Sequence, residues 1–89
     1  MNDKDLFKEI LGKHLHNIRV SKGFTQEGLA KEADADSKNI GRNERGEKLP
    51  NSYTLYKLQH SLDFSVDKLF KDIKLEMESI KQEKSDDEE

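Results

Sequence analysis

Apolar residues recur at three- and four-residue steps along most of the chain, the spacing that places them on one face of a helix. The longest such stretches are 3–22 and 66–82, and shorter ones occupy 26–33, 37–45 and 52–62. No stretch alternates apolar and polar residues as a half-buried strand does. The pattern therefore predicts an all-α fold, a compact domain of five helices with an extended C-terminal helix.

Local sequence also predicts where these helices begin and end. A side chain that can accept a hydrogen bond from the free N–H groups of a first turn precedes each helix. The candidate caps are Asn2 or Asp3, Thr25, Asp36 or Ser37, Asn51 or Ser52, and Ser65. Gly23 and Gly46 follow the first and third helices, where glycine commonly ends a helix. Asp34 and Asp63 follow the second and fourth, and aspartate tolerates a left-handed backbone better than most residues.

The last helix carries more apolar residues than a small core needs. Ile73, Met77 and Ile80 continue its apolar seam, and an exposed seam of this kind usually marks a partner surface. We expect these three residues to form a dimer interface with the same helix of a second chain. The alternative is that the seam folds back onto apolar residues near the N-terminus of its own chain, namely Leu6, Phe7 and Ile10. Both could hold, with the two extensions building one enlarged interface.

Charge is distributed unevenly along the 89 residues, a length that suits one small domain. Residues 1–70 carry 12 Lys/Arg against 11 Asp/Glu, a net charge of +1, whereas residues 71–89 carry 4 against 8, a net charge of −4. Residues 83–89 contain no apolar side chain and are predicted to be a disordered acidic tail. The sequence has no cysteine, no apolar run of the ~20 residues that cross a bilayer and no signal-peptide pattern, so we expect a cytoplasmic protein.

The third predicted helix has one basic face. At 100° per residue, Lys38, Arg42 and Arg45 lie within about 60° of one another, while Ile40 and Glu44 point the opposite way. A short helix with an inward isoleucine and an outward basic stripe suits insertion into a negatively charged groove. The alternative interpretation is a solvated helix face that binds nothing.

The spacing of residues around this helix favours the first interpretation. The relevant residues form an ordered set: Thr25, Gln26, Leu29, Ala30, Ala33, Ile40, Glu44, Gly46 and Pro50. This set resembles the helix-turn-helix of the lambda Cro and phage-repressor family, also called XRE-like, over about Leu11 to Phe70. The resemblance divides the chain into an N-terminal helical extension (1–10), a helix-turn-helix DNA-binding domain (11–70), a C-terminal amphipathic extension (71–82) and the acidic tail (83–89).

The resemblance implies a sequence-specific regulator of transcription, a repressor that acts as a homodimer on a pseudo-palindromic site in double-stranded DNA. By position, it implies base contacts from Ser37, Lys38 and Arg42 and phosphate contacts from Gln26, Arg45 and Lys48. Asn39 and Lys13 would flank these contacts. Family members also join an arginine and a glutamate inside the fold, here Arg19 and Glu44. Because a buried carboxylate needs a partner, Glu44 is expected to be a structural residue.

Several residues depart from the family pattern. Gly28 and Gly41 weaken the two motif helices, and Asn43 stands where the family usually has a large apolar residue. These departures and the small net charge keep a second interpretation open, a protein-interaction module on the same fold, such as an antitoxin or antirepressor. We expect no enzyme, cofactor or metal. The sequence has no nucleophile–base pair or phosphate-binding glycine loop, and His14 and His16 point to different sides of a helix.

Overall fold

The structure, a computed structural model, describes the backbone of residues 1–87 and the side chains through Glu83. It contains five α-helices, and residues 1–87 include no strand. The helices are α1 (Asp3–Ser21), α2 (Gln26–Ala33), α3 (Ser37–Glu44), α4 (Ser52–Leu62) and α5 (Val66–Asp87). The predicted all-α fold of five helices with an extended C-terminal helix is confirmed.

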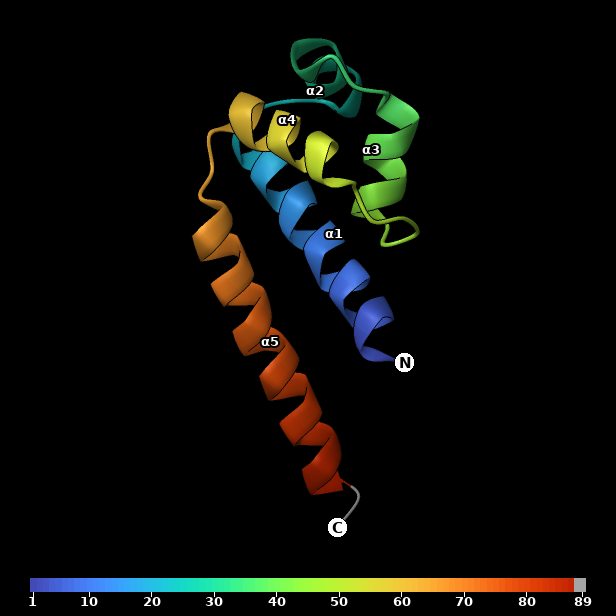
Figure 1. The fold of residues 1–89 in the computed structure, drawn as a ribbon, viewed down its shortest axis with the longest axis vertical. Helices are drawn as coiled ribbons and strands as arrows, with labels where there is room; N and C mark the ends of the chain where they lie inside the picture. Colours follow the sequence, from blue (N-terminus) through green and yellow to red (C-terminus); the bar gives the residue numbers. More distant parts are fainter. Residues whose placement is uncertain (88–89) are drawn as a thin grey trace.

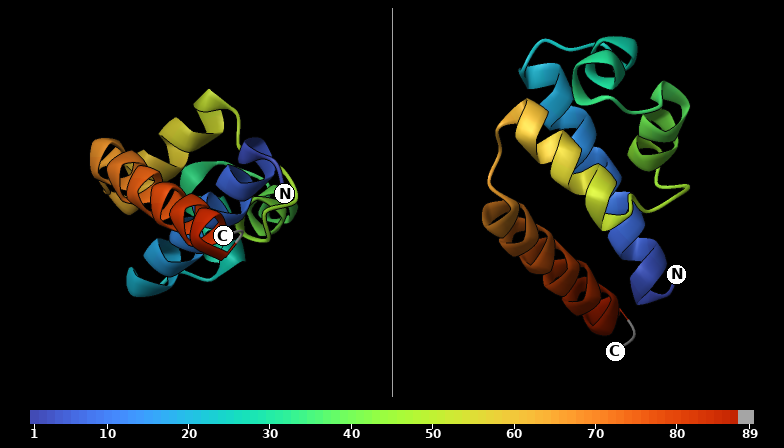
Figure 2. Two further views of the ribbon diagram at one scale, coloured as in Figure 1. Left: turned by 90° about the horizontal axis from the view of Figure 1, so that it is seen from below. Right: turned by 45° about the horizontal axis from the view of Figure 1, so that its top comes forward.

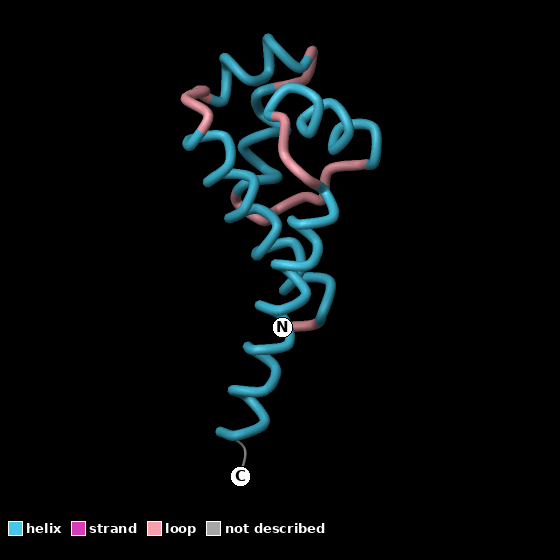
Figure 3. Tube along the Cα trace, turned by 90° about the vertical axis from the view of Figure 1, so that its left-hand side faces the viewer, coloured by secondary structure: helices cyan, strands magenta, loops and turns pink. Residues whose placement is uncertain are grey.

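The five helices form an elongated molecule of 49 × 22 × 22 Å. Helices α1 and α5 run side by side in opposite directions, and α2, α3 and α4 gather at one end of this pair (Figure 1; Figure 2). Viewed from the side, the chain narrows to α5 alone at its lower end (Figure 3). Helix α3 lies on the opposite side of α1 from α5, so its outer face is not covered by the C-terminal helix (Figure 1).

Side-chain caps begin all five helices at predicted positions. Each cap oxygen accepts a hydrogen bond from a backbone N–H of the first turn, which satisfies one of the donors that a helix start leaves free. The donor–acceptor pairs are Asp5 N with Asn2 (2.8 Å), Gly28 N with Thr25 (2.9 Å), Lys38 N with Asp36 (2.9 Å), Thr54 N with Asn51 (2.8 Å) and Lys68 N with Ser65 (3.1 Å). Asp34 and Asp63 end α2 and α4 with φ of 52° and 53°, in the left-handed conformation that the sequence allowed.

The hydrophobic core lies between the helices, where α1 packs on α3 and α5 and α2 packs on α3 and α4. Its buried residues come from every helix, and Leu29, Ile40, Leu62 and Ile73 are no more than 2% exposed. The other members are Ile10, Leu11, Leu15, Ala30, Ala33, Leu58 and Leu69. Because Ile40 packs in this core, α3 is fixed against α1 and its outer face has a defined orientation.

Gly12 allows α1 and α3 to touch backbone to backbone. A Cβ atom at this position would lie 2.5 Å from the carbonyl oxygen of Glu44 and 2.6 Å from that of Asn43, closer than real contacts permit. Both neighbours are backbone atoms, which cannot swing aside as a flexible side chain can. Glycine is therefore required here by packing, since α1 is an ordinary helix at this point.

Helix α5 differs from the sequence prediction in length and in partner. It continues to Asp87, beyond the predicted end near Gln82. Residues 88–89 of the predicted acidic tail lie outside the described residues. Its apolar seam packs on α1 of the same chain, as the alternative interpretation proposed. Ile73 is 1% exposed within one chain, so its side chain belongs to the core of that chain. Met77 and Ile80 are partly buried against the same core.

Polar and aromatic contacts fasten the two long helices along their length. The rings of Phe7 and Phe70 lie 6.3 Å apart between centroids. His14 Nε2 lies 2.8 Å from Glu76 Oε1, and Lys81 Nζ donates to Asp3 Oδ2 at 2.7 Å. These contacts join residues far apart in sequence, so they give the N-terminal extension a role in holding α5.

Candidate nucleic-acid interface

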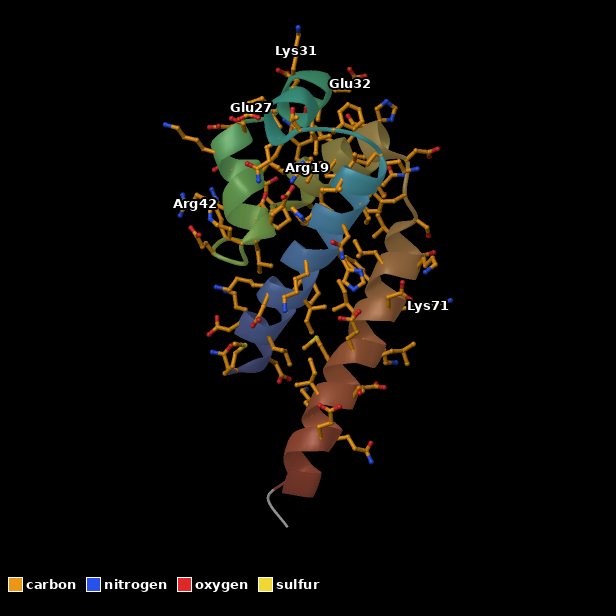
Figure 4. All side chains as sticks on the ribbon, turned by 180° about the vertical axis from the view of Figure 1, so that it is seen from behind. Arg19, Glu27, Lys31, Glu32, Arg42 and Lys71 are labelled. Carbon is orange, nitrogen blue, oxygen red and sulfur yellow. The ribbon has the colours of Figure 1, made fainter. Side chains whose placement is uncertain are left out.

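Helix α3 presents a basic outer face on a buried inner face. Ile40 is 2% exposed and points into the core, whereas Lys38, Arg42 and Arg45 are exposed to solvent. Arg42 projects away from the body of the protein in Figure 4. The buried isoleucine fixes which way the helix faces, so the basic side chains are directed outward by packing and not by charge alone.

A shallow hollow between α2 and α3 brings five of the predicted contact residues together. Gln26 comes from the start of α2, and Ser37, Lys38, Arg42 and Arg45 come from α3 and its C-terminal cap. The hollow is also lined by two residues that sequence reasoning did not assign to the site, Glu27 and Gly41.

Two other predicted contacts lie apart from this hollow. Asn39 lines a different depression, which it shares with the turn after α2 and with α4 residues Thr54 and Lys57. Lys48 is exposed in the loop that follows α3. Lys13, which was expected to flank the site, is exposed on α1 and pairs with Glu9 at 3.6 Å.

The expected pair of Arg19 and Glu44 joins α1 to the end of α3. Arg19 Nε donates to Glu44 Oε2 at 2.6 Å and Nη2 donates to Glu44 Oε1 at 3.0 Å, a two-pronged contact. The two side chains are 10% and 5% exposed. A further bond from Arg19 Nη1 to the carbonyl oxygen of Phe24, at 2.7 Å, ties the same guanidinium to the segment that leads into α2.

The carboxylate of Glu44 has two more neighbours besides Arg19. Its Oε1 lies 2.9 Å from His16 Nδ1 and accepts a bond from Gln26 Nε2 at 3.2 Å. Burial by itself raises the pKa of Glu44, but the hydrogen bonds from Arg19, His16 and Gln26 together outweigh it and hold the pKa below the ordinary value. Glu44 is therefore a charged, fixed anchor beneath Gln26.

A sequence comparison decides the family. No protein-family model matches the chain. An uncharacterised HTH-type transcriptional regulator, YazB, from Bacillus subtilis (strain 168) is 36% identical over 61 residues, which cover 68% of this chain and 88% of that protein. The chain belongs to the XRE-like family of helix-turn-helix transcriptional regulators.

Solved structures of regulators share the fold of this family member. The clp gene regulator ClgR from Corynebacterium glutamicum superposes with a TM-score of 0.75 at 28% identity, over 90% of this chain and 84% of that one. The restriction-modification controller protein C.AhdI from Aeromonas hydrophila superposes with a TM-score of 0.65 at 32% identity, over 73% and 96%. The first match extends over most of the chain, so the likeness is not confined to the helix-turn-helix.

Asn43 stands where the family usually has a large apolar residue, and it is buried in this regulator. It is 3% exposed, and its Nδ2 donates to the carbonyl oxygen of Lys48 at 2.7 Å. Its Oδ1 has no hydrogen-bond partner among the described residues. The amide thus holds the loop after α3 against the helix, a role that its place on the inward face could not reveal.

Acidic side chains stand beside the basic face of the regulator. Arg45 Nε donates to Glu47 Oε2 in an ion pair whose side chains are both about half exposed. Glu27, in the first turn of α2, lines the same hollow as Arg42. Among the residues that the structure describes, no three His, Cys, Asp or Glu side chains are grouped to hold a metal, and no described helix is long and apolar enough to span a membrane.

Proposed function

We propose that this regulator binds double-stranded DNA sequence-specifically by placing α3 in the major groove. The observation that carries the proposal is the orientation of α3, which buries Ile40 in the core and exposes Lys38, Arg42 and Arg45 on the opposite side. The major groove admits an α-helix, and cationic side chains supply most of the affinity for the phosphates that line it.

The exposed side chains divide into two roles. Ser37, Lys38 and Arg42 lie on the N-terminal and central part of α3, and we assign them to base edges; lysine and arginine suit guanine O6 and N7. Gln26 and Arg45 border the same hollow from its two sides, and we assign them to phosphates. Lys48 and Asn39 lie outside the hollow and would contact the flanks of the site.

A second copy of the chain would complete a two-fold site. An apolar groove between α1 and α5 is lined by Phe7, Phe70, Ile73 and Met77, with Lys74, Glu78 and Lys81 on its rim. Phe70 is 44% exposed there, although its ring contacts Phe7. Both signs of charge stand on the rim of one helix, so a two-fold related copy can set lysine against glutamate. We propose that this groove, which Ile73 and Met77 help to line and which Ile80 follows three residues further along α5, is the homodimer interface.

The DNA proposal is tested by titrating labelled duplexes selected from random sequence. We expect Arg42→Ala to lose about 1–3 kcal/mol on the selected duplex and to relax sequence preference there. Arg45→Ala should weaken all duplexes alike and lower the salt slope by about one unit. Lys71→Ala is the control, because Lys71 points outward from α5 far from α3 (Figure 4). If the parent binds no duplex at low salt, the regulator acts as a protein-interaction module instead.

The dimer proposal is tested by analytical ultracentrifugation. Phe70→Glu places a charge in the apolar groove and should yield monomers. Leu75→Glu introduces the same charge at a residue that is 64% exposed and does not line the groove, so it should leave the dimer intact. A parent that is monomeric at high micromolar concentration, or two variants that dissociate equally, would rule the groove out.

Repression is the regulatory outcome that we propose, because a protein seated in the major groove of a promoter excludes other proteins from the same DNA. A reporter gene placed downstream of the selected site should lose expression when the parent is produced. Arg42→Ala should restore expression. Raised expression with the parent would show that the protein is an activator.

A further inference from the structure

Gly41 lies in the middle of α3, where the backbone does not call for glycine. Its φ is not in the left-handed region, and glycine weakens a helix interior relative to alanine. The residue is nevertheless buried. The role of this glycine therefore lies in the space that a side chain would occupy.

Two side chains converge over the missing Cβ of Gly41. A Cβ atom built there would lie 3.0 Å from Arg45 Nη1 and 3.3 Å from Gln26 Oε1. The guanidinium of Arg45 comes from the end of α3 and the amide of Gln26 from the start of α2, so the glycine is where the two motif helices bring their polar tips together. A methyl group would press on both tips at once.

One of the two side chains is also held from the core side. Gln26 Nε2 donates to Glu44 Oε1 at 3.2 Å, and that carboxylate, 5% exposed, is itself fixed by Arg19. An amide nitrogen has two hydrogens, so one remains for an outside acceptor. Among the side chains that the structure describes, Glu47 is the one ion-pair partner of Arg45, and an incoming anion can replace this exposed pair.

We propose that Gly41 is a positioning residue for DNA binding. Its missing side chain lets Gln26 and Arg45 form one clamp for a backbone phosphate, with Glu44 fixing Gln26 from the core. The inference rests on the proposed function and deepens it, because it assigns one phosphate to both motif helices. Since a phosphate contact sets the register of the protein on DNA and carries no sequence information directly, the clamp acts alike on every duplex.

The test is Gly41→Ala, measured by thermal unfolding and by duplex titration over a range of salt concentrations. The melting temperature should stay level or rise, because the displaced atoms are the tips of flexible side chains and alanine favours the helix. Affinity should fall about tenfold on the selected duplex and on an unrelated one, with a shallower salt slope. Unchanged affinity with parental DNA binding intact would overturn the inference alone, whereas absence of binding by the parent would overturn the proposed function as well.

A double variant and a signal that needs no DNA sharpen the test. Gly41→Ala combined with Gln26→Ala should lose less affinity than the sum of the two single variants if both act on one clamp. Fully additive losses would contradict a shared site. In the free protein, Gly41→Ala should also shift the side-chain amide NMR signals of Gln26. An unmoved Gln26 amide would show that the glycine does not position it, whatever the stability of the variant.

Discussion

Replacing Glu44 by alanine should be the most damaging single change in the helix-turn-helix. The substitution removes the acceptor of two bonds from Arg19. It leaves that guanidinium, 10% exposed, with the carbonyl oxygen of Phe24 and with His16 Nδ1, which lies 3.2 Å from Nη2. Removing one partner of a buried ion pair typically costs about 3–5 kcal/mol, because the other charge stays buried without compensation. Domains of this size are stable by roughly 0.05–0.15 kcal/mol per residue, so the loss is a large fraction of the total.

Urea and thermal unfolding followed by circular dichroism would measure this loss. At roughly 4–8 °C per kcal/mol for a domain of this length, the melting temperature of Glu44→Ala should fall by at least about 12 °C. Glu47→Ala is the matched control, because it removes a carboxylate from an ion pair that is about half exposed on both sides. A melting temperature for Glu44→Ala within a few degrees of the parent would refute the reasoning, since it would mean that water solvates the Arg19 guanidinium in the variant.

The stability of the fold at acidic pH should also depend on the carboxylate of Glu44. The pKa of Glu44 lies below its ordinary value of 4.5 in the folded protein. A carboxyl group with a lowered folded pKa stabilises the fold above its unfolded pKa, and that stability is lost as the pH falls through the folded pKa. The parent should therefore lose stability on acidification below about pH 4.5 more steeply than Glu44→Gln does. Parallel pH profiles would show that Glu44 does not carry the acid sensitivity.

Three further substitutions test the packing and the charge of the interface. Gly12→Ala should destabilise by about 1–3 kcal/mol despite the better helix propensity of alanine, because its methyl group meets backbone of α3; a raised melting temperature would contradict that close contact. Asn43→Leu removes a bond to the carbonyl oxygen of Lys48, which destabilises the fold, and an unpartnered buried Oδ1, which stabilises it. Because the two effects oppose each other, the free energy of unfolding in urea should change by less than about 1 kcal/mol. Amide hydrogen exchange in residues 46–50 should become faster, because the loop loses its bond to the helix. Glu47→Gln should leave the melting temperature unchanged and strengthen binding to every duplex, most at low salt, because it frees Arg45; weaker binding would show that the pair orients the guanidinium.

Helix boundaries in this protein could be predicted from the sequence because their causes are local. Each cap donates or accepts within one turn, and the left-handed aspartates that end α2 and α4 act on their own backbone. The outward basic face of α3 was equally readable, since helical periodicity alone opposes Ile40 to Arg42. The end of α5 was not, because the polar residues after Gln82 can continue a helix as well as end it.

Tertiary structure decided every feature that depends on a partner distant in the chain. By its spacing the apolar seam of α5 fits α1 or a second copy equally well, and only the folded chain shows that Ile73 is buried where α5 packs on α1. The roles of Gly12 and Gly41 could not be predicted, because a glycine has no side chain that adds to an apolar or polar pattern. Each role depends on which atoms of other residues occupy the space where a Cβ would be. The bond of Gln26 to Glu44 spans 18 residues and two helices, so the link between the core ion pair and the DNA-facing hollow appears only when the chain is folded.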